Sequence, residues 1–237
     1  MREDVATYLV ELNQRFYDGF ADAFSDSRGA TEQGIERILG MIEPGQRVLD
    51  LGCGQARLAL LLPAACTYVG IDNSRQMLRV AADRIAAAAT HPTTTLLRRD
   101  LTRDDWDNDL REGFDWVFLR AALQHIPGYE RRLEVVRRAD RVRTLDGRIV
   151  LANWQILRSE RLRRRVLPWS AAGLSDEDVD NGDYLVGWAR GGSGMRYVHV
   201  VDESEVDRMA AELEFVVAER FLADGHSDDL TFYAILR

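Results

Sequence analysis

A buried strand that runs directly into a glycine loop is the feature that most constrains this chain. The run 48–51 reads Val-Leu-Asp-Leu, and Gly52-Cys53-Gly54 follows it. Because glycine has no Cβ atom, the two glycines let the backbone approach a ligand closely. A second apolar run, 68–71, ends in Asp72, and an acid at the tip of a second strand suits the two hydroxyls of a ribose. The sequence therefore predicts a unit that binds a nucleoside-bearing cofactor.

The loop differs from a dinucleotide-binding fingerprint. That fingerprint, G-x-G-x-x-G/A, places a third small residue beside a pyrophosphate, whereas Arg57 stands at that position here and Ala56 comes one place early. A carboxylate two places before the first glycine, Asp50, would repel a pyrophosphate but could hold the ammonium of an amino acid. The pattern resembles motif I of the class I S-adenosylmethionine-dependent methyltransferases, in which the acid and glycines face the methionine end. An unrelated α/β domain with a tight turn is the alternative.

The order of apolar runs predicts the fold class. Strands are expected at 47–51, 67–72, 94–98, 114–119, 147–153, 215–222 and 230–236, and helices at about 56–62, 74–89, 129–143 and 203–213. This alternation predicts a Rossmann-like, mainly parallel seven-stranded sheet with both faces covered. The connection 224–227 is too short for a crossover helix, so the last strand should be antiparallel.

Two further segments complete the expected single domain, 1–237. Residues 1–43 show helical periodicity and should form an N-terminal cover, whereas residues 155–200 should form a lid inserted after the fifth strand, above the carboxyl edge of the sheet. The start of the chain is charged with no apolar segment behind it, and no stretch approaches the ~18 apolar residues of a membrane helix. We therefore expect a cytoplasmic protein without membrane partners.

Charge bears on the class of substrate. The net charge is −8, which argues against indiscriminate binding of nucleic acid. Arginines nevertheless crowd the segments 131–143 and 158–165. They indicate either solvated helix faces or a local phosphate-binding patch.

The methyltransferase resemblance implies a set of cofactor-binding residues. Asp100 follows the third strand, where the family places an acid at the adenine amino group; a turn-capping acid is the alternative. The full set expected to bind S-adenosyl-L-methionine is Tyr17, Arg28, Asp50, Gly52, Cys53, Gly54, Asp72, Asn73, Met77, Asp100, Leu101 and Arg120. No metal is expected, because the four histidines are scattered without ligand spacing.

A narrower resemblance rests on several short motifs in order. Phe16-Tyr17 and the run 24–28, Phe-Ser-Asp-Ser-Arg, precede motif I; 122–125 reads Ala-Leu-Gln-His; Trp154 ends the fifth strand; and 196–199 reads Arg-Tyr-Val-His. This order looks like the methyltransferases that esterify carboxymethyl groups on wobble uridines of transfer RNA. Gln124 and Val198 depart from the H-H and R-Y-Y-H motifs of that family. The departures leave its substrate open here.

The acceptor determines which residues catalysis needs. An ionised carboxylate is already a nucleophile and needs a positioning cation, for which Arg28, Arg120 and Arg196 are candidates. A nitrogen, phenol or hydroxyl acceptor needs a base. The predicted catalytic residues are His125, Arg196 and His199. The alternatives are a structural His125 that bonds to backbone, a structural salt bridge of Arg196, and a capping or core role for His199. The predicted substrate contacts, for which packing is the alternative, are Trp154, Trp169, Tyr184, Trp188 and Tyr197.

Three functions are consistent with these patterns. The acidic balance and a compact lid favour a methyltransferase acting on a small molecule. The motif order and the arginines at 158–165 favour a transfer RNA methyltransferase acting on a modified wobble uridine. A non-catalytic cofactor-binding subunit is the third, although the complete set of acids and glycines speaks against it.

Overall fold

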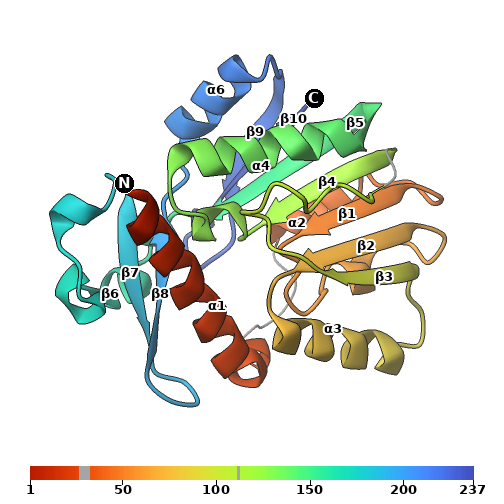
Figure 1. The fold of residues 1–237 in the computed structure, drawn as a ribbon. Coiled ribbons are helices and arrows are strands. Elements are labelled where there is room, and N and C mark those ends of the chain that lie inside the picture. Colours follow the sequence, from red (N-terminus) through yellow and green to blue (C-terminus); the bar gives the residue numbers. More distant parts are fainter. Residues whose placement is uncertain (27–32, 111–112) are drawn as a thin grey trace.

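The computed structural model describes residues 1–26, 33–110 and 113–237. Its main element is a seven-stranded sheet (Figure 1). In spatial order the strands are β3 (Thr93–Arg98), β2 (Thr67–Asp72), β1 (Arg47–Leu51), β4 (Phe114–Arg120), β5 (Arg143–Trp154), β10 (Thr231–Leu236) and β9 (Val217–Ala223). The pairs from β3 to β5 are parallel, whereas β10 is antiparallel to both β5 and β9. The predicted Rossmann-like sheet with a reversed last strand is confirmed.

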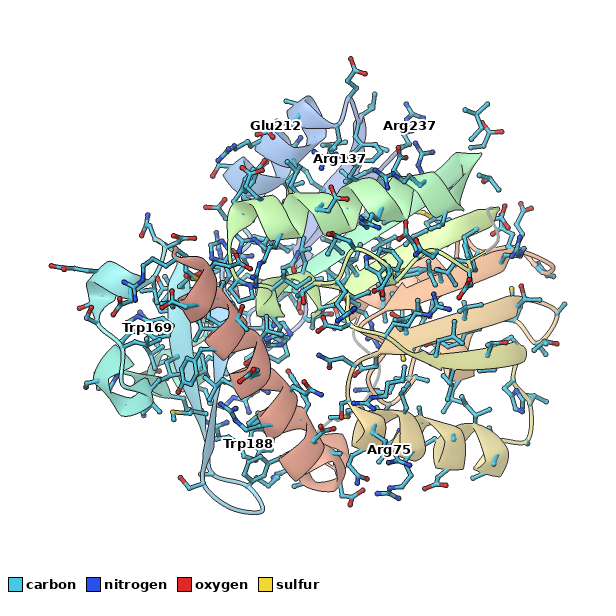
Figure 2. The ribbon with its side chains drawn as sticks, in the orientation of Figure 1. Arg75, Arg137, Trp169, Trp188, Glu212 and Arg237 are labelled. Carbon is cyan, nitrogen blue, oxygen red and sulfur yellow. The ribbon has the colours of Figure 1, made fainter. Side chains whose placement is uncertain are left out.

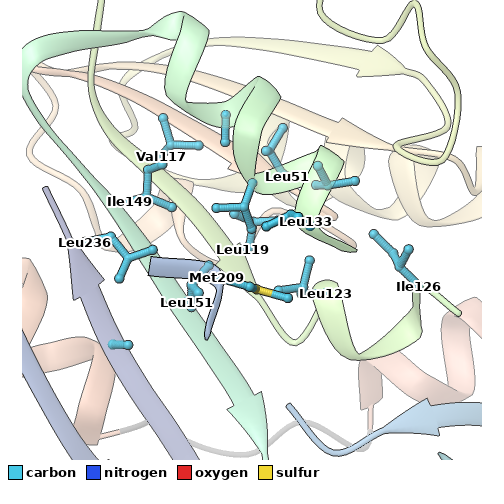
Figure 3. Close-up of a cluster of buried hydrophobic side chains, with 14 of the residues drawn as sticks. Leu51, Val117, Leu119, Leu123, Ile126, Leu133, Ile149, Leu151, Met209 and Leu236 are labelled. Carbon is cyan, nitrogen blue, oxygen red and sulfur yellow. The ribbon is translucent and has the colours of Figure 1, made fainter. Parts of the chain in front are cut away.

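Helices cover both faces of this sheet because each has one apolar side. The helices α4 (Tyr129–Val142) and α6 (Glu203–Glu212) cover one face, and α2 (Gln33–Leu39) and α3 (Arg75–Ala87) cover the other. Figure 2 shows the charged side chains of Arg137 and Glu212 on the outer sides of α4 and α6. Figure 3 shows their apolar counterpart, where Leu133 and Met209 meet the strand residues Leu119 and Leu151. Two buried cores thus hold the sheet, one on each face.

The helix α1 (Glu3–Asp26) lies outside this three-layer arrangement and runs between α3 and β8 (Gly194–His199) (Figure 1). Its buried residues recur at three- and four-residue spacing, Val5, Leu9, Leu12 and Phe16, as expected for one apolar stripe. In the C-terminal half of α1, Asp18 Oδ1 accepts a hydrogen bond from the hydroxyl of Ser74 at 2.6 Å.

The segment between β5 and α6 forms a second, three-stranded antiparallel sheet. Its strands are β6 (Val166–Leu167), β7 (Asp183–Trp188) and β8, and its helical turns are η3 (Ile156–Arg158), α5 (Glu160–Arg163), η4 (Trp169–Ala172) and η5 (Asp176–Asp178). The sequence predicts an insertion here but none of these strands. Between β7 and β8 the chain turns at Gly191 and Gly192, which both have positive φ angles.

The predicted helix at 56–62 is wrong. The chain there makes turns and one short 3₁₀ helix, η1 (Ala59–Leu61). Ala56 has a left-handed φ of 52°, which starts no α-helix, and Pro63 closes the segment soon after. A second 3₁₀ helix, η2 (Leu123–His125), follows β4. Across the described ranges, every helix is too short or too polar to span a bilayer.

Candidate active site

A cavity of about 170 Å³ lies at the carboxyl ends of β1, β2, β4 and β5. This edge is where open α/β sheets bind their ligands. The floor comes from the loops that follow these strands, and Thr231 at the start of β10 completes it. The helix α1 lies over the cavity and contributes Val10, Asn13, Gln14 and Tyr17 to its wall. The N-terminal helix therefore covers the cavity.

Backbone hydrogen bonds shape the glycine loop. The amides of Gly52 and Cys53 donate to the carbonyl of Ile71 at 2.8 and 2.9 Å. Gly52 has a φ of +74°, and a Cβ atom on it would lie 2.5 Å from the Cβ of Ala122. Gly54 has a φ of +53° and open space where a Cβ would be, beside the cavity that it lines. A side chain at position 54 would take up space that a ligand could use.

Asp72 joins the glycine loop to the second strand. Its Oδ2 accepts from the amide of Gly54 at 2.8 Å and its Oδ1 from the amide of Ser74 at 2.9 Å. Burial raises the pKa of Asp72 to about 6, against the opposing effect of these two hydrogen bonds. The carboxyl group lines the cavity and is mostly ionised at neutral pH, so it can accept further hydrogen bonds from a ligand.

Asp100 also lines the cavity, together with Leu101, Asn73 and Met77. Its Oδ1 accepts from the amide and the hydroxyl of Thr102 at 2.9 and 2.7 Å. The turn-capping alternative is thus realised, and the same carboxyl group still borders the cavity.

Asp50 does not lie where the sequence predicts it. The side chain is 2% exposed, lies behind the cavity wall, and accepts a hydrogen bond from the hydroxyl of Tyr68 at 2.8 Å. Burial raises its pKa, and the charge of Arg120, which does line the cavity, opposes that rise. Cys53 lines the cavity as a thiol, because burial and the charges of Asp72 and Asp50 raise its pKa well above the usual range. It is a filler and no nucleophile.

The side chains of Tyr17 and His125 contact each other in the cavity wall. The hydroxyl of Tyr17 lies 2.8 Å from Nε2 of His125, and Nδ1 of His125 lies 2.9 Å from the carbonyl oxygen of Tyr197. Asn13 fixes the backbone of the same residue: its Oδ1 accepts from the amide of Tyr197 at 2.7 Å and its Nδ2 donates to the carbonyl at 3.1 Å. The backbone of Tyr197, on β8, is therefore joined to both α1 and η2.

Arg196 lies beside the cavity and not in its wall. The side chain is 4% exposed, and its guanidinium group lies 5.0 Å from the ring centres of Phe16 and Trp154 and 5.7 Å from that of Trp188. Burial lowers its pKa, and a hydrogen bond to Tyr17 opposes this. Arg196 thus reaches the cavity through Tyr17.

His199 belongs to a buried ionic cluster on the far side of β8. Its Nδ1 lies 2.6 Å from Asp183 Oδ1 and its Nε2 lies 2.7 Å from Glu205 Oε2, which Arg132 also contacts. Burial lowers the pKa of His199, but the hydrogen bonds to the two carboxylates outweigh it and raise the pKa above 6.5. These hydrogen bonds favour the protonated form of His199, and the cluster ties β7, β8 and α6 together, away from the cavity.

The predicted aromatic substrate contacts divide in the same way. Trp154 lines the cavity, whereas Trp169, Tyr184, Trp188 and Tyr197 lie outside its wall. Figure 2 shows Trp169 and Trp188 among the side chains of the three-stranded sheet, beside α1. They pack there because one apolar face of the three-stranded sheet is buried against α1. Arg28 falls outside the described residues.

Several wall residues escape the sequence analysis. Asn13 and Gln14 look like ordinary polar positions of an amphipathic helix, and Thr231 opens a strand that follows a loop. Only the rotation of α1 about its axis brings the first two over the cavity. The sequence does encode that rotation, because residues four apart, such as Asn13 and Tyr17, lie on the same face of a helix.

Comparison with known proteins identifies the central part of the chain. Residues 48–147, from β1 into β5, match the family model for a methyltransferase domain. The chain carries a methyltransferase domain. A magnesium protoporphyrin IX methyltransferase from Synechocystis PCC 6803, solved with bound SAH, superimposes with a TM-score of 0.64 at 17% identity, over 97% of this chain and 98% of that one. The likeness extends the shared fold over nearly all described elements.

Curated relatives agree with the methyltransferase class. The tRNA (carboxymethyluridine(34)-5-O)-methyltransferase of Arabidopsis thaliana is 26% identical over 141 residues, which are 59% of this chain and 32% of that protein. The 27-O-demethylrifamycin SV methyltransferase of Amycolatopsis mediterranei is 27% identical over 164 residues, 60% of this chain and 58% of that protein. The chain spans about a third of the length of the first curated relatives that it matches.

Proposed function

We propose that this protein transfers the methyl group of S-adenosyl-L-methionine to a small-molecule acceptor. The observation that carries the proposal is the cavity wall formed by Gly54, Asp72 and Asp100, within a chain that has the methyltransferase fold. Asp72 would accept hydrogen bonds from the ribose hydroxyls, Asp100 one from the adenine amino group, and the open side of Gly54 leaves room for the methionine chain.

The cofactor, when bound, supplies an electrophilic methyl group on a sulfonium ion, and no metal is needed for that chemistry. The protein's own task is to align the acceptor and to exclude water. The helix α1 supports this role, because it lies over the cavity and contributes Tyr17 to its wall. We assign the same covering role to the three-stranded sheet, which acts by holding α1 in place.

A small acceptor is supported by the size and cover of the cavity. Its volume of about 170 Å³ and its roof of helix suit a compact ligand, and the net charge of −8 disfavours a polyanion. The demethylrifamycin and magnesium protoporphyrin methyltransferases named above act, by their titles, on small molecules. We extend that substrate class to this chain.

Calorimetry with S-adenosylhomocysteine tests the cofactor site. Asp72→Ala should weaken binding by about 1–3 kcal/mol, the scale of a hydrogen bond to a charged group. Asp83→Ala, which removes an exposed carboxylate on α3 outside the cavity, is the matched control and should bind like the wild type. Equal affinity for all three proteins would exclude Asp72 from the site, and no binding by the wild type would refute the proposal.

A transfer RNA substrate is the second candidate. The arginines 161, 163 and 164 are exposed on and beside α5, and the Arabidopsis relative is named for such a substrate. Binding of transfer RNA in a gel-shift assay should then weaken steeply between about 50 and 200 mM salt. Replacement of the three arginines by glutamine should remove that binding. If transfer RNA is not retained even at low salt, the small-molecule proposal stands alone.

A further inference from the structure

We propose that Tyr17 and His125 form a proton relay for a hydroxyl acceptor, so that the methyl group is placed on an alcohol or phenol oxygen and not on a carboxylate. The inference rests on the proposed function and names the substrate class of the same cavity. Both side chains line the cavity, and they lie 2.8 Å apart.

The direction of the relay follows from the partners of His125. A carbonyl oxygen can only accept, so Nδ1 of His125 must carry the proton that is donated to Tyr197 at 2.9 Å. In a neutral imidazole Nε2 is then a lone-pair acceptor, and the hydroxyl of Tyr17 donates to it. A hydroxyl acceptor bound in the cavity would donate to the oxygen of Tyr17, and its proton would have a continuous path to Nε2.

The acceptor class follows from what a base is needed for. A carboxylic acid, with a pKa of about 4, is ionised at neutral pH, whereas a phenol, with a pKa of about 10, keeps its proton. A carboxylate acceptor would not need the oriented imidazole as a base. It would need a cation to position it. Arg196, one of the predicted cations, stands behind Phe16 and Trp154 outside the cavity wall. Arg120 does line the cavity, but its charge acts on the buried carboxyl group of Asp50, whose pKa it lowers.

The step balances as follows. The acceptor oxygen forms a bond to the methyl carbon while the bond from sulfur to that carbon breaks, and the electron pair of the broken bond stays on sulfur. The proton of the acceptor passes to Tyr17 as the proton of Tyr17 passes to His125 Nε2. His125 ends as an imidazolium, which returns its proton to water when the products leave.

Arg196 is a positioning residue for this relay. It lies over the ring of Phe16, the neighbour of Tyr17 on α1, at 5.0 Å, and its hydrogen bond to Tyr17 places a positive charge beside the phenol oxygen. That charge favours the tyrosine oxygen while it carries negative charge during proton transfer. Arg196→Lys should therefore slow turnover when introduced alone and have little further effect when added to Tyr17→Phe. The reason is that both side chains act through the hydroxyl oxygen of Tyr17. Additive losses would assign Arg196 a purely structural role.

The first experiment identifies the product. The protein is confirmed to bind S-adenosylhomocysteine, then incubated with methyl-labelled S-adenosylmethionine and a metabolite extract, and the product is treated with mild base. A base-stable methyl ether, identified by mass spectrometry, is the expected result. Release of labelled methanol shows a carboxyl methyl ester and would overturn the inference, as would methylation of nitrogen, while both leave the proposed methyltransferase activity intact. A protein that does not bind S-adenosylhomocysteine would instead refute the proposed function.

Variants test the relay on that product. Tyr17→Phe and His125→Gln should each slow turnover on the order of 10²-fold, the usual worth of a positioned acid or base, with unchanged affinity for S-adenosylhomocysteine. Tyr8→Phe is the matched control: it removes a hydroxyl from the same helix, one that donates to the carbonyl of Ala172 outside the cavity at 3.1 Å, and turnover should stay at the wild-type rate. Turnover of Tyr17→Phe at the wild-type rate would overturn the relay.

A measurement without any acceptor checks the geometry directly. In ¹⁵N NMR spectra of the protein bound to S-adenosylhomocysteine, His125 should be protonated at Nδ1, and the Nε2 signal should move in Tyr17→Phe. A His125 ring protonated at Nε2 and not at Nδ1 would contradict the relay.

Discussion

The ionisation of Asp72 should make cofactor affinity depend on pH. Its pKa of about 6 lies well above the usual value of about 3.9 for an aspartate, because the group is buried near other carboxylates before any ligand arrives. If the ribose hydroxyls bind the ionised form, the apparent affinity is scaled by the ionised fraction. That fraction is about 0.9 at pH 7 and about 0.1 at pH 5. Affinity for S-adenosylhomocysteine should therefore fall about tenfold between these values, or about 1.4 kcal/mol.

Isothermal titration calorimetry at several pH values between 5 and 7 measures this dependence. Asp72→Asn is the control, since an amide does not titrate. Its absolute affinity should be lower at every pH, because both oxygens of Asp72 accept from backbone amides, those of Gly54 and Ser74, and an amide NH₂ cannot accept. The slope is the readout. An equal tenfold fall in Asp72→Asn would show that another group titrates and would refute the reasoning.

Three further predictions concern stability and closure. Gly52→Ala should lower the free energy of unfolding by about 1–3 kcal/mol in urea titrations, because of its φ of +74° and its clash with Ala122; a loss below about 0.5 kcal/mol would show that the loop can adjust. His199 has a raised pKa, so its contribution is complete below pH 6.5 and is lost as pH rises through the folded pKa; His199→Gln should lack this alkaline loss, and an unchanged pH profile would contradict the cationic cluster. Asn13→Ala should increase proteolysis of α1 without cofactor more than with it, since the buried amide joins α1 to β8; equal cleavage of mutant and wild type would argue against that role.

The sequence predicts the fold well because the buried strands of a parallel sheet are continuous apolar runs. The glycine loop and Asp72 could be placed from sequence for the same reason, since their spacing to the strands fixes them at one edge. The helix expected at 56–62 is absent because a single residue, Ala56, takes a left-handed conformation that the local pattern does not encode.

Side-chain direction was harder to predict than position. Arg196 points to one face of β8 and Tyr197 and His199 point to the other. The three-stranded sheet that decides which face meets the cavity is itself formed by contacts distant in sequence. Asp50 was expected to face the cofactor, but the hydroxyl of Tyr68, from a neighbouring strand, accounts for its place behind the wall. The roles of the predicted site residues stay predictions until the variants above are measured.

The hairpin of β7 and β8 is needed for more than packing, because it carries the carbonyl group of Tyr197. Shortening this hairpin would do more than uncover the cavity: it would take away the carbonyl that sets which nitrogen of His125 is basic. A deletion variant could thus retain the nucleoside and still fail to activate an acceptor. The loss of catalysis would then come from a backbone atom, the carbonyl oxygen of Tyr197, and not from any side chain.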